Sequence, residues 1–167
     1  MHRTVRAACV IAALCCAPAH AQEAKLLQKF NDWSAYATSG SAKTCFAVSK
    51  PKESLPKGVR RGPIFIYISA YPSDSIKNEV SIKMGYPFAA GAKVSATIGS
   101  DKFELFTKDE GAFVEKPATE TEFIEAMKKG SQLKVEGTSA RGTKTTDNYS
   151  LQGFAPALER VAQECNS

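Results

Sequence analysis

Short runs of apolar or alternating residues dominate the chain after its first 21 residues, with clusters of Gly, Pro, Ser and Asp between them. Apolar side chains at every second position, or a brief unbroken run of β-branched and aromatic residues, are typical of β-strands. We expect nine strands, at residues 33–37, 44–49, 64–70, 79–84, 93–98, 102–107, 112–115, 133–138 and 148–152. Their frequent spacing with intervening turns predicts a mainly β fold of two packed antiparallel sheets.

One of these strands differs from the others because it has no polar position. The run from Pro63 to Ile68 is apolar throughout. A strand in the middle of a sheet that is covered on both faces has this composition. We therefore place this segment at the centre of the core and expect cover on both of its faces.

Two short helices interrupt the strand pattern in the C-terminal half. For the first, Thr119 is the predicted N-cap, Glu122 completes a capping box and Gly130 ends the helix. The second is expected at residues 155–165, where apolar residues recur at helical spacing and Cys165 is on the inward face.

The first 21 residues have the pattern of an export signal. Arg3 and Arg6 precede an apolar run at residues 7–17, and Ala19-His20-Ala21 has the small-x-small form of a cleavage site. The apolar run is shorter than the roughly 20 residues that cross a bilayer, which argues against a membrane anchor. We expect residues 1–21 to be cleaved, residues 22–167 to form a single domain, and no later segment to span a membrane.

Cleavage would remove both histidines of the chain, His2 and His20. Histidine is the commonest general base and the commonest transition-metal ligand, so its absence favours binding over catalysis and predicts neither a metal site nor a cofactor. Loss of two arginines with the leader lowers the net charge from +5 to about +3. That charge is too small to predict nucleic-acid binding.

Two cysteines remain after cleavage, Cys45 near the start and Cys165 near the end. An even pair in an exported chain usually bonds, because the compartment is oxidising. We predict a Cys45–Cys165 disulfide that ties the last helix to a strand. Two buried free thiols are the alternative.

A basic segment at residues 50–61 is the candidate binding site. Its five cations are Lys50, Lys52, Lys57, Arg60 and Arg61. Arginine holds phosphate or carboxylate in a bidentate way, and lysine adds attraction without fixed direction. The predicted partner is an anionic envelope component such as lipopolysaccharide, an acidic glycan or an acidic protein surface. The alternative interpretation is a solvated loop without a partner.

The rival function is a carboxylate-dependent periplasmic hydrolase. Asp109 and Glu110 are expected in a hairpin turn, and the glutamates at 120, 122 and 125 fit the first turns of a helix, where the helix dipole favours them. Glycoside hydrolysis needs two carboxylates at a defined separation across a substrate. A deep cleft with two facing carboxylates would favour the hydrolase, and a flat sandwich with a basic loop would favour binding.

Several segments of the chain, in this order, carry a family resemblance. They are Phe-Asn-Asp-Trp at 30–33, Cys-Phe-Ala-Val at 45–48, Met-Gly-Tyr-Pro-Phe at 84–88, Gly-Ala-Lys-Val at 91–94, Met-Lys-Lys-Gly at 127–130, Leu-Lys-Val at 133–135 and Ser-Leu-Gln-Gly-Phe-Ala-Pro-Ala-Leu at 150–158. Together with the leader they resemble the invasion-associated locus B family of bacterial envelope proteins.

The resemblance implies an immunoglobulin-like antiparallel β-sandwich that is periplasmic or secreted in a Gram-negative bacterium. It also implies virulence, since some family members are associated with entry into host cells, and it supplies no enzymatic mechanism. Additional cysteines that are common in the family, after the first tryptophan and in the middle of the domain, are absent here. The chain therefore resembles a divergent branch.

Overall fold

The structure, a computed structural model, describes residues 23–40 and 42–165, so the predicted leader at 1–21 lies outside it. Within these residues eleven strands form one antiparallel sheet with the order β1-β2-β3-β5-β6-β9-β8-β7-β10-β11-β4. The strands are β1 Ala24–Phe30, β2 Trp33–Thr38, β3 Cys45–Ser49, β4 Glu53–Leu55, β5 Phe65–Tyr71, β6 Ile76–Lys83, β7 Lys93–Ile98, β8 Asp101–Lys108, β9 Gly111–Phe113, β10 Gln132–Thr138 and β11 Lys144–Ser150. The mainly β prediction is confirmed.

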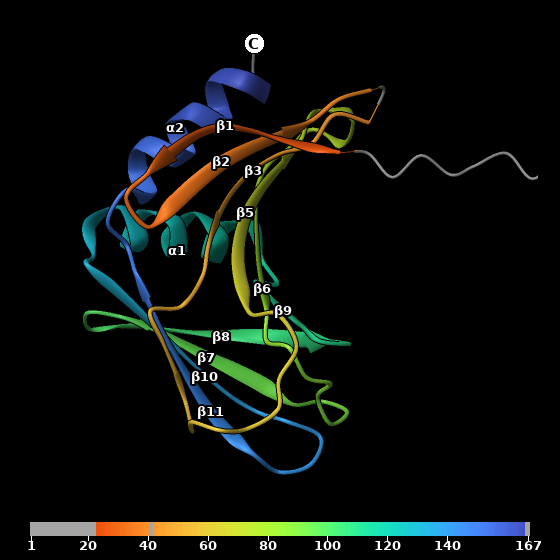
Figure 1. Cartoon of the computed structure of the whole chain (residues 1–167), viewed down its shortest axis with the longest axis vertical. Helices are drawn as coiled ribbons and strands as arrows, with labels where there is room; N and C mark the ends of the chain where they lie inside the picture. The colour runs from red at the N-terminus through yellow and green to blue at the C-terminus, as the bar shows by residue number, and fades with distance from the viewer. Residues whose placement is uncertain (1–22, 41, 166–167) are drawn as a thin grey trace, which may run out of the picture.

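This sheet folds over into a β-sandwich (Figure 1). We call β1, β2, β3, β5 and β6 the first half-sheet, and β9, β8, β7, β10, β11 and β4 the second half-sheet. In Figure 1 the first half-sheet is drawn above the second. The chain leaves β3 in the first half-sheet, adds β4 to the free edge of β11, and returns to β5. Residues 50–64 therefore connect the two half-sheets twice.

Two helices cover the inner side of the sandwich, α1 (Pro117–Lys129) and α2 (Phe154–Cys165). Helix α2 packs on β1, β2, β3 and β5, whereas α1 packs on β6, β8 and α2. Trp33 is fully buried beneath α2, where its ring lies 4.8 Å from that of Phe154 and its Nε1 donates to the carbonyl of Ser150. Strand alternation supplies the rest of the core, since every second residue of β2, β3, β7, β10 and β11 is buried.

The predicted disulfide is confirmed. Cys45 at the start of β3 is bonded to Cys165 at the end of α2, with 6.0 Å between their Cα atoms. The bridge closes a segment of 120 residues and joins the last helix to the first half-sheet. In the described part of the chain, no helix has the length and apolar character needed to cross a membrane.

The first helix differs from its prediction at its N-terminus. It begins at Pro117 with Lys116 at the N-cap position, so Thr119 lies inside the helix and does not cap it. The fixed φ of proline and its missing N–H suit the first helical position, and this moves the start two residues ahead of the predicted cap. Gly130 follows the last helical residue, as expected.

The central strand also differs from its prediction. β5 pairs with β3 and β6, and its Ile66 and Ile68 are fully buried. Its other face carries Phe65 and Tyr67, which are only partly buried. The strand is therefore covered by core on one face alone, and aromatic rings on the other face replace the second layer that the sequence suggested.

Candidate functional site

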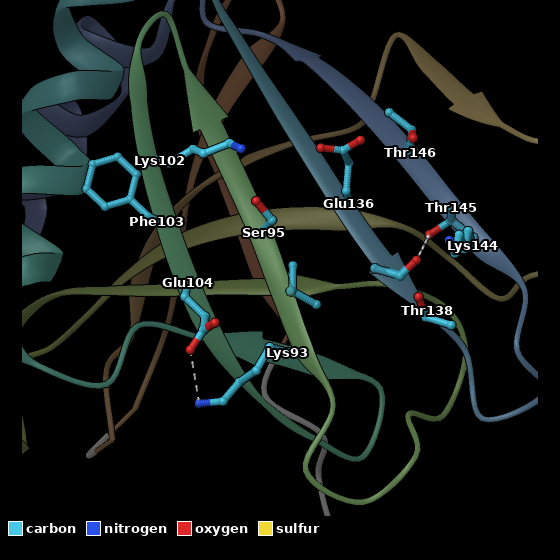
Figure 2. Close-up of a pocket in the computed structure, with 12 residues that line it drawn as sticks. Lys93, Ser95, Lys102, Phe103, Glu104, Glu136, Thr138, Lys144, Thr145 and Thr146 are labelled. Atoms are coloured by element: carbon cyan, nitrogen blue, oxygen red, sulfur yellow. Dashed lines mark hydrogen bonds and ion pairs between the residues drawn. The ribbon is translucent and has the colours of Figure 1, made fainter.

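The outer face of the second half-sheet is mainly polar, although Phe106 of β8 is exposed on it. Cross-strand register places Glu104, Ser95 and Glu136 in one row, and Figure 2 shows their three side chains on neighbouring strands. These residues line an open hollow of about 560 Å³. Each carboxylate has a lysine partner, since Lys93 lies 3.5 Å from Glu104 and Lys134 lies 3.0 Å from Glu136. A charged, hydroxyl-rich surface of this kind is typical of a solvated antiparallel face.

The outer face of the first half-sheet is aromatic. Tyr36 stacks on Phe46 with ring centroids 5.4 Å apart, and Phe46 meets Tyr67 at 5.8 Å. Tyr67 then meets Phe65 at 5.7 Å. All four rings are half-buried and belong to β2, β3 and β5. We call these four residues the aromatic cluster. The outer face of the first half-sheet therefore carries four neighbouring aromatic rings, each of them half-buried.

A hollow of about 500 Å³ lies beside the aromatic cluster, and we call it the lysine hollow. Its lining includes three lysines, one acid and two aromatic residues, namely Lys29, Lys50, Lys52, Asp32, Tyr36 and Phe65, together with smaller residues such as Ser34 and Val48. Lys29 lies opposite Ser34 across the β1–β2 ladder, which brings the first cation to this face. The ammonium of Lys50 is 5.2 Å from the centre of the Phe65 ring, a cation–π distance that holds this charge at the rim.

The charge of the hollow is positive. Lys52 donates to Oδ1 of Asp32 at 2.8 Å, and this hydrogen bond holds the pKa of Asp32 below its usual value. Asp32 therefore stays ionised and offsets one lysine. Within the described part of the chain, Lys29 and Lys50 form no ion pair with a carboxylate. The charges of these two lysines are thus not offset by an ion pair among the described residues.

Only part of the predicted basic site is brought together. Lys50 and Lys52 line the lysine hollow, whereas Lys57 and Arg60 are exposed in the connection between β4 and β5 and do not line it. Lys29 is not among the residues predicted for the binding site, because β1 is not among the predicted strands. The Lys-Leu-Leu-Gln-Lys sequence at 25–29 does not alternate between apolar and polar residues, and the β1–β2 register shifts between Leu26 and Gln28, so the sequence carries no clear signal for this strand.

Arg61 is a correction. Its side chain is only 6% exposed, and its guanidinium forms a bidentate pair with the fully buried carboxylate of Asp147. Two further hydrogen bonds reach the carbonyl of Met84, and the ring of Tyr86 lies 5.0 Å away. All three nitrogens of this guanidinium donate hydrogen bonds to acceptors within the protein. The prediction of an exposed Arg61 at a ligand surface is therefore wrong.

The acidic clusters do not form a catalytic pair. Asp109 and Glu110 occupy the turn between β8 and β9, as predicted, and Glu110 lies 3.8 Å from Lys83. Glu120 accepts a hydrogen bond from the Val80 amide, and burial raises its pKa. Glu104 and Glu136 share a face, but both carry lysine partners on an open surface. The described residues contain no group of three His, Cys, Asp or Glu placed to hold a metal ion.

A sequence profile of the invasion associated locus B protein family matches residues 33–162. The chain belongs to this family. None of the curated proteins compared with the chain matches it.

The crystal structure of invasion associated protein B from Bartonella henselae has the same fold. The two structures superpose with a TM-score of 0.59 at 16% sequence identity, over 84% of this chain and 98% of the other. At this identity the likeness shows the invasion associated locus B fold and says nothing about individual side chains. Only the side chains of this protein itself therefore bear on the role of the lysine hollow.

Proposed function

We propose that this member of the invasion associated locus B family is an exported protein of the bacterial envelope, periplasmic or secreted, that binds an anionic component. The observation that carries the proposal is the lysine hollow, where Lys29 and Lys50 form no ion pair with any carboxylate of the described residues and lie beside Lys52. Export is supported by the signal pattern of residues 1–21 and by the disulfide, which needs an oxidising compartment.

Binding without catalysis suits the chemistry of the hollow. Lysine at an open surface attracts anions over a distance close to the Debye length, and it needs no precise geometry to do so. The carboxylates that a hydrolase would need are paired with lysines on an open face, where water has free access. No described observation favours the hydrolase, so we do not propose it.

The test is salt-dependent retention on an immobilised sulfated polysaccharide such as heparin. The full coding sequence is expressed in a Gram-negative host, and the wild type is compared with the double variant Lys29→Gln, Lys50→Gln. The matched control is Lys102→Gln, Lys144→Gln, which removes two exposed lysines from the outer face of the second half-sheet. We expect the lysine-hollow variant to elute at clearly lower salt than the wild type and the control variant to elute close to it.

Equal elution of the two double variants would overturn the proposal, because the retention would then come from overall charge. A third variant, Lys57→Gln combined with Arg60→Gln, tests the remainder of the predicted basic segment. We expect it to behave like the control, since neither residue lines the hollow. A larger defect in this variant than in the lysine-hollow variant would move the site to the connection between β4 and β5.

A further inference from the structure

The strand register shows how the lysine hollow is built. Ser34 of β2 lies opposite Val48 of β3, and these two residues form the floor. Tyr36 is two positions further along β2 on the same face, so its ring borders one side. Lys50 and Phe65 border the opposite side, one strand apart, and Lys29 contributes from β1. Apolar and cationic groups thus surround one small space.

The rings at the border are held before any ligand arrives. Tyr36 is fixed by stacking on Phe46, and Phe65 is fixed between Tyr67 and the ammonium of Lys50. Fixed aromatic side chains offer contact area at a low cost in conformational entropy. The polar atoms beside them include the Ser34 hydroxyl and the Asp32 carboxylate. Hydrogen-bonding groups, ring surface and cations therefore meet within one hollow.

Resting on the proposed function, we propose that the ligand is an acidic oligosaccharide, whose sugar rings lie against Tyr36 on one side of the hollow and Phe65 on the other while its carboxylates or phosphates meet Lys29 and Lys50. A sugar ring has apolar C–H faces that pack on aromatic side chains and hydroxyl groups that bond to Ser34 and Asp32. A hollow of about 500 Å³ is within the range of small-ligand sites, roughly 300 to 1,000 Å³. The acidic saccharide matches each kind of group that the hollow presents.

Two other classes of anionic partner match it less well, namely those that need lysines alone and acidic protein surfaces. A simple anion or an anionic lipid surface would need lysines alone, and the aromatic rings that border the lysine hollow would then have no role. An acidic protein surface would need a wider complementary patch than the three lysines of one hollow. The pairing of Lys50 with the Phe65 ring is what separates the saccharide from both.

The experiment measures binding of trigalacturonate to the purified protein by calorimetry. Neutral maltotriose, tripolyphosphate and phosphatidylglycerol vesicles are the comparison probes. We expect trigalacturonate to bind more tightly than all three. Saturation-transfer NMR should show that the sugar-ring protons receive magnetisation from the protein, and this measurement needs no variant.

The substitution Phe65→Leu separates the saccharide proposal from the anion proposal. It should weaken trigalacturonate binding about tenfold or more and leave any tripolyphosphate binding unchanged. The matched control is Phe106→Leu, which removes an exposed ring of β8 outside the hollow and should change neither. The double substitution Lys29→Gln, Lys50→Gln should weaken the binding of both trigalacturonate and tripolyphosphate.

Each alternative outcome has one meaning. The proposal of a saccharide ligand is overturned if tripolyphosphate or the vesicles bind as tightly as trigalacturonate. It is also overturned if Phe65→Leu and Phe106→Leu have the same effect on trigalacturonate binding. The anion-binding proposal then stands as long as the lysine substitutions still weaken binding. If the lysine substitutions change nothing, both proposals fail.

Discussion

Arg61 and Asp147, 86 residues apart, are joined by two hydrogen bonds, from Nη1 to Oδ1 at 2.8 Å and from Nη2 to Oδ2 at 2.7 Å. The pair links the segment before β5 to the middle of β11, and so it joins the two half-sheets. Removing one partner of a buried pair leaves an uncompensated charge in the interior. This cost is usually larger than the net contribution of the intact pair.

The first prediction is that Arg61→Ala lowers the free energy of unfolding by about 3 to 5 kcal/mol, because the Asp147 carboxylate is fully buried. Urea unfolding followed by the fluorescence of Trp33, the single tryptophan, measures the change. The adjacent Arg60→Ala is the control and should change stability by less than about 0.5 kcal/mol, because Arg60 is exposed. Similar losses in the two variants would contradict the assigned role of Arg61.

The second prediction concerns the Cys45–Cys165 bridge. On the chain-entropy model, a bridge that closes a segment of 120 residues stabilises the fold by about 4 to 5 kcal/mol. Thermal unfolding of the wild type should therefore move to lower temperature when a reductant is added. Cys165→Ser should melt at a low temperature that no longer responds to the reductant. Recovery of both cysteines as alkylated thiols from the exported protein would show that the bridge does not form.

The third prediction concerns Gly153, in the turn between β11 and α2. Its φ is +89°, and a Cβ atom there would collide with the carbonyl oxygen of Phe30 at the end of β1. Gly153→Ala should therefore be strongly destabilising. Gly91 also has a positive φ, +72°, but open space surrounds it. Gly91→Ala should cost only the backbone strain, about 1 to 2 kcal/mol, so the difference between the two variants isolates the collision. Equal losses in urea would argue against the close approach to Phe30.

The fourth prediction is a pH dependence that arises from Glu120. Burial, with a smaller effect from Glu79, raises the pKa of Glu120 above its ordinary value of 4.5. The folded protein then favours the protonated form, so its contribution to stability is present below pH 4.5 and is lost as the pH rises through the raised pKa. Glu120→Gln should remove this loss and raise stability near pH 7 by less than about 1 kcal/mol, since Glu120 is only half-buried.

The contribution of Glu125 to stability has the opposite dependence on pH. A hydrogen bond from Lys128 lowers the pKa of Glu125, so its contribution is present above pH 4.5 and is lost as the pH falls through the lowered value. The melting temperature of Glu120→Gln minus that of the wild type should rise from pH 4 to pH 7. The same difference for Glu125→Gln should fall. Parallel behaviour would mean that neither assignment holds.

Local patterns were sufficient for much of this fold. Residues 33–37 and 93–98 alternate between apolar and polar or half-buried side chains, and both ranges became strands with every second residue buried. The spacing of Leu158, Val161 and Cys165 placed all three on the buried face of α2. That inward position, with one other cysteine outside the leader, is why the disulfide was predictable.

Long-range partners explain what the sequence did not show. Nothing near Arg61 indicates that Asp147 lies beside it, so its charge was interpreted as exposed. The aromatic cluster escaped notice for a related reason, because Phe65 and Tyr67 look like core residues until the fold shows that no second layer covers them. The site of the proposed ligand depends on the second of these facts, because Phe65 lines the lysine hollow.

Residues 50–61 are fixed to the rest of the fold at two points, and the stretch between these points is a suitable insertion site. On one side the Lys52 amide donates to the carbonyl of Asn148 and β4 pairs with β11, and on the other side Arg61 is held by Asp147. Residues 57–60 between these points are exposed, and long insertions at such positions cost little free energy. An epitope or a fluorophore inserted there would report where the protein resides in a living cell while the lysine hollow stays intact.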